Sequence, residues 1–491
     1  MTGADDAGRR VWMKQALSIG LATATGSVAA ATSGAGSEAA SGILKRDLAP
    51  PEPPANMAAG AEANGAAASL VIRAAHLLSM DPLLGEQRDC DVLIQGARIM
   101  AVGANLVAPG ARVIDGCGKI VMPGLIDAHW HMWNSLGRSA GPAQDGRAFF
   151  QVLRDIALRS TPETAQLAVR LAAAQARRAG ITTINNWAHN LRDAEFADAE
   201  YGAMAACGLR GRFWYGYPQD LAADSLMDLP AIAQWQRSVS QQRESRIDLG
   251  VAVRGPERTT AAVWQAEFDA AAELTLPLSV HVAVTKAMQE KHAIRQLAER
   301  GLLRRGVQLV HATHASDDDL RRIASSGATV CLTPLTEMRV GYGLPPIAAL
   351  MRAQVPISLG IDTTVLSGRA DPFAVMQAAL NVATAMAHDE HALTPQAVLR
   401  WATQGGADEM GWGDRVGSVT PGKLADLVLI DAHHPDMAPV SYAAAAVVQS
   451  CTPAAITHVI ANGVVHEAAA MLEELRELTA LADQAWRKLG A

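Results

Sequence analysis

Eight short apolar segments recur through the middle of the chain, and each ends in a polar residue or a proline. From the second segment onward, successive ends lie 23 to 37 residues apart, which leaves room for one strand and one helix. Eight such units predict an α/β fold in which parallel strands close into a (β/α)8 TIM barrel, here expected over residues 123–415. The segments end near His131, Asn186, Tyr217, Arg254, His281, His311, Pro334 and Asp362.

The flanks of this central part show a different pattern, that of short strands separated by turns. Residues 68–122 and 416–467 contain apolar, β-branched runs, and Asn462-Gly463 is a strong two-residue hairpin signal. Because similar strands occur on both sides of the repeat, we expect both chain ends to build one small β-sandwich domain. The last segment, 468–491, is expected to be a C-terminal helix.

Composition narrows the classes of protein to which the chain can belong. With 49% hydrophobic and 19% charged residues it is a globular chain, and a net charge of −7 without a basic block argues against a nucleic-acid partner. Its five cysteines include no Cys-x-x-Cys pair, which excludes a disulfide scaffold and a thiolate zinc site.

The first 67 residues resemble an export signal followed by a flexible linker. Gly8-Arg9-Arg10-Val11-Trp12-Met13-Lys14 is similar to the twin-arginine consensus, and the stretch from Ala16 to Ala31 is mildly apolar. That stretch is too short and too rich in small residues for stable membrane insertion. We therefore expect a periplasmic or secreted protein; the alternative is a cytoplasmic protein with a disordered tail.

Histidines and one aspartate occupy several of the predicted strand ends. His129 and His131 are two residues apart, so on a strand both imidazoles point to the same face. His281, His311 and Asp362 end three later segments, and carboxyl ends of barrel strands meet at one mouth. Imidazoles with a carboxylate suit one divalent ion, most naturally Zn²⁺, with Fe²⁺ or Mn²⁺ as alternatives.

These motifs resemble the amidohydrolase superfamily, on the branch of cytosine, guanine and S-adenosylhomocysteine deaminases and triazine hydrolases. The resemblance covers about residues 69–467 and includes the run Pro-Gly-Leu-Ile-Asp-Ala-His-Trp-His at 123–131 and the late segment 419–428. It implies that one metal is held by His129, His131, His281 and Asp362. It also implies two catalytic residues: Asp362 takes the proton of the activated water, and His311 faces that water or the substrate.

The sequence departs from this branch at two strand ends. At the fourth, where binuclear relatives use a lysine or glutamate, the chain has Arg254, which cannot ligate a metal, and then Glu257, so we expect one metal. After the fifth, position 284 is a valine where deaminases usually carry the acid that protonates the ring nitrogen. Glu257, Glu337 or His189 could replace that acid, or the substrate does not need it.

The function predicted from these features is metal-dependent hydrolysis of a C–N bond, other than a peptide bond, in a small cyclic or heterocyclic molecule. The alternatives are hydrolysis of a carbamate, carbon–halogen or carbon–sulfur bond, or a non-catalytic metal- or ligand-binding relative. The expected partner is a small-molecule substrate, and the sequence leaves the oligomeric state open, with a homo-oligomer as one alternative. Substrate-binding candidates are His189, Arg254, Glu257, Glu337 and Trp133.

Overall fold

The computed structural model describes residues 69–242 and 245–490. The twin-arginine-like motif and the linker lie outside these residues, and their prediction stays a prediction. Within the described ranges, none of the helices combines the length and the apolar character needed to cross a membrane.

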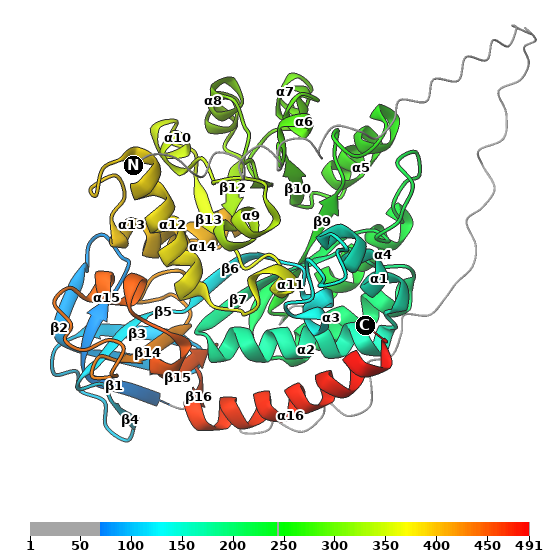
Figure 1. Ribbon diagram of the computed structural model, residues 1–491. Helices are drawn as coiled ribbons and strands as arrows, with labels where there is room; N and C mark the ends of the chain where they lie inside the picture. Colours follow the sequence, from blue (N-terminus) through cyan, green and yellow to red (C-terminus); the bar gives the residue numbers. More distant parts are fainter. Residues whose placement is uncertain (1–68, 243–244, 491) are drawn as a thin grey trace, which may run out of the picture. The chain divides into compact units, whose positions relative to one another are not determined.

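Eight parallel strands form the barrel, and each neighbours the next in sequence order from β6 to β13 (Figure 1). A parallel bridge between Trp130 and Asp362 brings the last strand back to the first. The predicted fold class is therefore confirmed. The strands are β6 (Leu125–Trp130), β7 (Ile181–Ala188), β8 (Arg210–Tyr215), β9 (Ile247–Val253), β10 (Leu278–Val282), β11 (Val307–His311), β12 (Thr329–Leu332) and β13 (Ile357–Leu359).

Helices surround the barrel, and their starts follow from local sequence. The α2 helix begins after Thr161, whose side chain accepts the Thr164 N–H, with Pro162 at the first helical position. The helices are α1 (Phe149–Arg159), α2 (Pro162–Arg178), α3 (Ala194–Ala206), α4 (Leu229–Gln241), α5 (Ala261–Glu273), α6 (Lys286–Gln289), α7 (Ala293–Glu299), α8 (Asp317–Ser326), α9 (Pro334–Val340), α10 (Ile347–Arg352), α11 (Thr364–Ser367), α12 (Pro372–Ala387), α13 (Pro395–Arg400), α14 (Gly406–Met410), α15 (Ala443–Gln449) and α16 (Ala468–Lys488), with short 3-10 or π turns at Met132–Gly137, Trp401–Gly405 and Pro453–Ala455.

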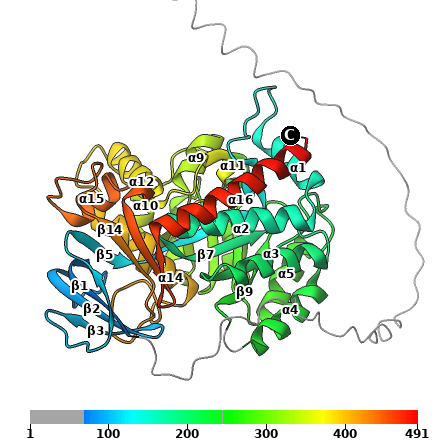
Figure 2. The ribbon, with the colours of Figure 1, turned by 90° about the horizontal axis from the view of Figure 1, so that it is seen from below.

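A second, mixed sheet combines strands from both sides of the barrel in the sequence. Its order is β16-β15-β14-β5-β1-β2-β3, with β4 paired to β1, and its core is apolar. The long α16 helix runs along α2 (Figure 2) and buries Leu478 and Ala482 against that helix. The strands of this sheet are β1 (Ser69–Leu78), β2 (Glu86–Gln95), β3 (Arg98–Gly103), β4 (Arg112–Asp115), β5 (Lys119–Pro123), β14 (Leu427–Asp431), β15 (Ile456–Ala461) and β16 (Val464–Glu467).

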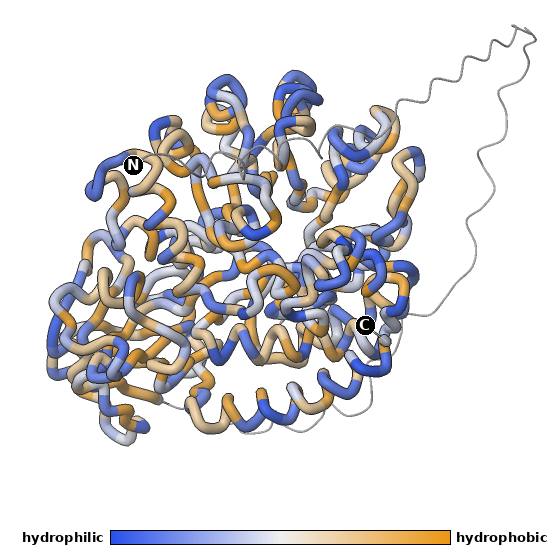
Figure 3. The backbone as a smooth tube through the Cα atoms, viewed as in Figure 1, coloured by the Kyte–Doolittle hydropathy of each residue, from blue (hydrophilic) through white to orange (hydrophobic). Residues whose placement is uncertain are grey.

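Barrel closure brings the first and last strands into close contact. A Cβ atom at Gly360 would come within 2.7 Å of the His129 carbonyl oxygen, so only glycine permits this approach. Asp127 contributes too, because its carboxylate accepts the Ile361 N–H at 2.7 Å. Figure 3 shows apolar segments along the barrel strands and polar segments on outer helices such as α7 and α8.

Glu200 on α3 is a carboxyl group fully buried beside the barrel. One of its oxygens accepts the Asn186 side-chain N–H at 2.9 Å, and the other has no hydrogen-bond partner among the described residues. Burial raises the pKa of Glu200 from its ordinary 4.5 to about 8. Between these two values the folded protein holds a proton that the unfolded chain has lost, so the free energy of unfolding falls as the pH rises through this window.

We expect Glu200→Gln to stabilise the protein increasingly between pH 4.5 and pH 8, because glutamine keeps the shape and never ionises. The expected gain in the free energy of unfolding at pH 8.5 is about 2 kcal/mol, and almost none at pH 4.5. Denaturant unfolding at both pH values measures it, with the exposed Glu273→Gln on α5 as the control. A gain that is equal at both pH values would contradict the expectation.

Candidate metal centre and active site

Three histidine side chains converge at the carboxyl ends of β6 and β10. The Nε2 atom of His129 lies 3.2 Å from Nε2 of His131 and 3.2 Å from Nε2 of His281. Together they are the one group in the described part of the chain whose ligand atoms all lie close enough to share a metal ion. Nitrogens that each bind one tetrahedral zinc at 2.0–2.1 Å are about 3.3 Å apart, so this spacing fits a zinc-type ion.

The protonation of these rings also suits metal binding. Burial lowers the pKa of His129 to about 4 and holds that of His281 well below its ordinary value, so both are neutral at pH 7. His131 donates its Nδ1 proton to the Trp187 carbonyl oxygen at 3.2 Å, which leaves the Nε2 lone pair facing the other two rings. A backbone carbonyl that fixes the ring in this tautomer is the usual support of a metal-binding histidine.

Asp362 completes the cluster from the end of β13. Its Oδ1 lies 3.3 Å from Nε2 of His131 and 3.5 Å from Nε2 of His129. Burial opposes ionisation, but the histidines beside it hold the pKa of Asp362 well below its usual range. Its backbone has a φ of 64°, a strained conformation for a residue with a side chain, and is held there by hydrogen bonds to His129 and His131.

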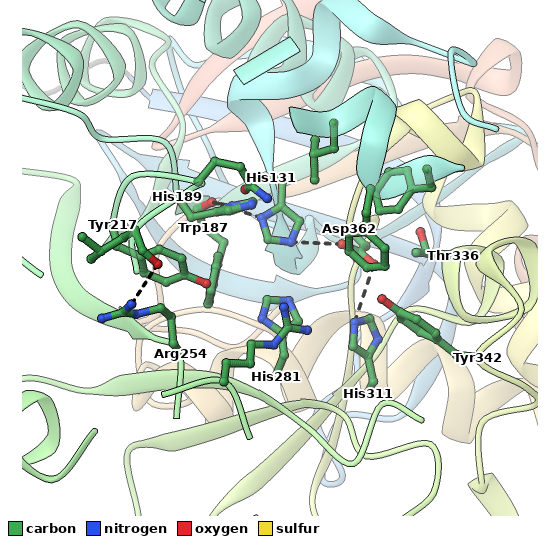
Figure 4. Close-up of a pocket in the computed structure, with 16 residues that line it drawn as sticks. His131, Trp187, His189, Tyr217, Arg254, His281, His311, Thr336, Tyr342 and Asp362 are labelled. Atoms are coloured by element: carbon green, nitrogen blue, oxygen red, sulfur yellow. Dashed lines mark hydrogen bonds and ion pairs between the residues drawn. The ribbon is translucent and has the colours of Figure 1, made fainter. Parts of the chain in front are cut away.

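His311 approaches Asp362 from the neighbouring side, and a second carboxylate supports it. Its Nε2 lies 3.9 Å from Oδ2 of Asp362, and Figure 4 shows His131 and His311 on two sides of that carboxylate. On the far side of the ring, Nδ1 donates to Glu337 at 3.2 Å and lies 3.1 Å from the hydroxyl of Thr333. This hydrogen bond fixes the orientation of the His311 ring, with Nε2 towards Asp362.

A cavity of about 260 Å³ opens beside these residues. Aromatic rings form most of its apolar wall, and it is small enough to suit a compact planar molecule. Its lining residues are His131, Phe149, Phe150, Leu153, Trp187, His189, Tyr217, Gln219, Leu221, Arg254, Arg258, His281, His311, Thr336, Tyr342 and Asp362.

Among the predicted substrate-binding residues, His189 lines the cavity and Trp133 lies behind it. The Trp133 indole N–H donates to Nδ1 of His189 at 3.2 Å. Because an indole nitrogen can only donate, the proton of the neutral imidazole is on Nε2. Burial, followed by the charge of His131, holds the pKa of His189 well below its ordinary value. His189 therefore presents a neutral N–H donor.

The other three predicted substrate-binding residues form hydrogen bonds to other groups of the protein. Arg254 lines the cavity, but its guanidinium is bound to Glu267 at 2.8 Å and to three backbone carbonyl oxygens. Glu257 is buried beside the cavity and accepts the Ala283 N–H at 2.6 Å. Glu337 is fully buried behind His311 and does not line the cavity.

A family model described as the amidohydrolase family matches residues 120–465. The chain belongs to the amidohydrolase family. The amidohydrolase family is metal-dependent. As a member of this family, the chain is a hydrolase of carbon–nitrogen bonds other than peptide bonds.

Curated relatives match most of the chain. A 5-methylthioadenosine/S-adenosylhomocysteine deaminase of Pelotomaculum thermopropionicum is 26% identical, over 81% of this chain and 92% of its own. An 8-oxoguanine deaminase of Pseudomonas aeruginosa is 25% identical, over 67% and 78%.

Solved structures share the fold over almost their full length. An adenosine deaminase of Xanthomonas campestris with bound zinc has a TM-score of 0.74 and 25% identity, covering 85% of this chain and 99% of its own. An atrazine chlorohydrolase of Arthrobacter aurescens, also solved with zinc, has a TM-score of 0.74 and 22% identity, covering 84% and 100%. At that identity the second likeness shows the fold alone.

Some cavity residues of this amidohydrolase were not predicted from sequence, among them Phe149 and Phe150 on α1. Tyr217 and Tyr342 form opposite ends of the wall. Tyr217 does end a predicted strand, and its position was the one available signal. Val284, by contrast, is fully buried and does not line the cavity.

Proposed function

We propose that this amidohydrolase is a mononuclear zinc enzyme that removes an amino group, as ammonia, from a small nitrogen heterocycle. The observation that carries the proposal is the cluster of three imidazole nitrogens beside Asp362, at the wall of an aromatic cavity. The deaminases among its relatives support a heterocyclic substrate.

His129, His131, His281 and Asp362 are the residues that would hold the ion. When bound, such an ion supplies Lewis acidity that brings the pKa of a water molecule close to neutrality. No further cluster able to hold a metal occurs within 69–242 and 245–490, and Arg254 stands at the end of the fourth strand, both of which support a single metal.

The protein's own groups then handle protons and position the substrate. Asp362 accepts the proton of the attacking water and passes it to the departing amine, because it is ionised and adjacent to the cluster. His311, oriented by its hydrogen bond to Glu337, faces the attacking water with its Nε2 and positions it. His189 donates its Nε2–H to the substrate, and the rings of Trp187, Tyr217 and Tyr342 enclose the heterocycle.

Val284 favours a second candidate function within the same family. Because position 284 carries no acid, the alternative is hydrolysis of a substrate that needs no protonated ring nitrogen. Such a substrate would be an amide, a carbamate or a halogenated ring. Glu257 is the competing source of a proton, because burial raises its pKa to about 7, but its carboxylate faces the Ala283 N–H.

The test measures metal content and products on the same zinc-loaded protein. We expect about one zinc per chain by elemental analysis, and ammonia release from at least one aminopurine or aminopyrimidine in a panel that also includes amides, carbamates and chlorotriazines. Chloride or acyl products without ammonia would favour the second candidate. Less than about 0.1 metal per chain after zinc addition would overturn both.

A further inference from the structure

Three side chains with a formal charge line the cavity: Asp362, Arg254 and Arg258. Asp362 faces the histidine cluster, and Arg254 is bound to Glu267 and to backbone carbonyls of the 221–225 loop. The charges of Asp362 and Arg254 are thus both paired with other groups of the protein. The charge of Arg258 is not paired within the described residues.

Arg258 lies on the turn that follows β9 and projects to the cavity without a partner. The turn is closed by a hydrogen bond from the Arg258 N–H to the Gly255 carbonyl oxygen at 3.2 Å. Its side chain makes no hydrogen bond or ion pair with any residue that the structure describes, and its Nε is buried with its proton unused. A guanidinium carries five donors and stays charged at any physiological pH, so this half-buried group has its hydrogen-bonding capacity free for a ligand.

The electrostatic influence of Arg258 reaches both ends of the cavity. Burial raises the pKa of Tyr217 to about 12, and the Arg258 charge is the first effect that opposes it. Burial also raises the pKa of Tyr342, and there too Arg258 is the main opposing charge. Figure 4 shows these two tyrosines at opposite ends of the pocket, so the guanidinium acts on the space between them.

A planar ligand between these rings would therefore lie within reach of one unmatched positive charge. Arg254, the other arginine at the wall, is paired with Glu267, and no lysine lines the cavity formed by the described residues. Guanidinium groups bind carboxylate and phosphate oxygens with two parallel hydrogen bonds, and such charge-assisted bonds are the strong ones in proteins.

We propose that Arg258 is a specificity-determining residue that binds an anionic oxygen group, a carboxylate or phosphate, carried by the heterocyclic substrate. The inference rests on the proposed function for the heterocycle and adds the charge of the substrate to it. Arg258 binds and orients this group and takes no part in proton transfer.

The experiment compares matched charged and neutral compounds on zinc-loaded enzyme. One pair is 4-aminopyrimidine-5-carboxylate and its carboxamide, and the other is adenosine 5′-monophosphate and adenosine, so the two pairs separate carboxylate from phosphate. We expect the wild type to prefer the anion of at least one pair. Arg258→Met is expected to lower kcat/KM for that anion about 30-fold, mainly through KM, and to change the neutral compound less than about threefold.

Two further variants separate binding from folding. Arg258→Lys keeps the charge but loses the paired donors, so it should recover part of the preference. Arg237→Met, an exposed arginine on α4, is the control and should leave every constant unchanged. Thermal unfolding of each variant identifies any that fold poorly, and in that case Arg258→Lys carries the comparison.

A binding measurement keeps this inference separate from the proposed function. Nicotinate and nicotinamide differ in one negative charge, and calorimetry on zinc-loaded protein measures their affinities whether or not any compound is deaminated. Tighter binding of nicotinate that disappears in Arg258→Met supports the inference even if no ammonia is released. Equal affinities in the wild type, or a preference that survives in Arg258→Met because another group binds the carboxylate, would overturn it.

Discussion

Replacing Asp362 with asparagine is expected to reduce kcat about 1,000-fold on the best substrate of the panel. Asparagine keeps the shape and the oxygen that faces His131 at 3.3 Å, but its amide cannot accept and return a proton. The rate constant, the zinc content and the unfolding temperature are measured on the same preparation. We expect the unfolding temperature to stay within about 3 °C, since no buried volume changes.

The matched control for this variant is Asp483→Asn, at an exposed position on α16. It removes one carboxylate without touching the cavity, and its kcat should equal that of the wild type. An Asp362→Asn enzyme that retains more than about a tenth of the wild-type kcat, with zinc bound, would refute the role of Asp362 as the proton carrier.

Replacing His281 with alanine is expected to have a comparable effect through metal binding. Its Nε2 lies 3.2 Å from that of His129, and alanine leaves the cluster with two imidazoles and one carboxylate. Zinc content should fall from about one to below about 0.1 per chain after dialysis, and turnover should fall at least about 1,000-fold. Added zinc raises the unfolding temperature of a protein whose folded state binds it, and this rise should be lost in the variant.

An alanine at His391 provides the control, because that imidazole is 86% exposed and far from any predicted ligand in the sequence. It should keep both the zinc content and the zinc-dependent rise in unfolding temperature. A His281→Ala protein that still binds one zinc per chain after dialysis would show that this residue is not a ligand.

The eight-stranded barrel could be predicted because each strand carries its own evidence. Apolar runs such as 307–311 and 329–332 are short, largely buried and spaced for one helix between them. Which strands neighbour each other then follows from connectivity, since consecutive parallel strands joined by helices lie side by side. The mixed sheet was predictable for the same local reason, namely strand patterns on both sides of the repeat.

The ligand set could be predicted because it stands at strand ends, whereas the cavity wall could not. His129 and His281 lie at the carboxyl ends of buried strands and Asp362 lies shortly after a third, so the topology brings them together. Phe149 comes from α1 and Tyr342 from the segment after α9, and the sequence does not determine how these segments fold over the mouth of the barrel.

Arg254 and Arg258 show the limit of sequence reasoning most clearly. Both follow the fourth strand, but from sequence only Arg254 was predicted to bind the substrate. Only the tertiary structure decides between them, because Glu267 on α5 and the carbonyls of the 221–225 loop pair with Arg254 and leave Arg258 free.

The sequence by itself determined the α/β barrel, the mixed β-domain from both chain ends and the strand-end positions of the histidines and Asp362. These features depend on local periodicity and chain order. The tertiary structure alone decided which polar groups are satisfied by the protein and which face the cavity: the His131 tautomer, the support of His311 by Glu337 and the unpaired guanidinium of Arg258. Such pairings join residues tens of positions apart, and their geometry exists only once the helices and loops have packed.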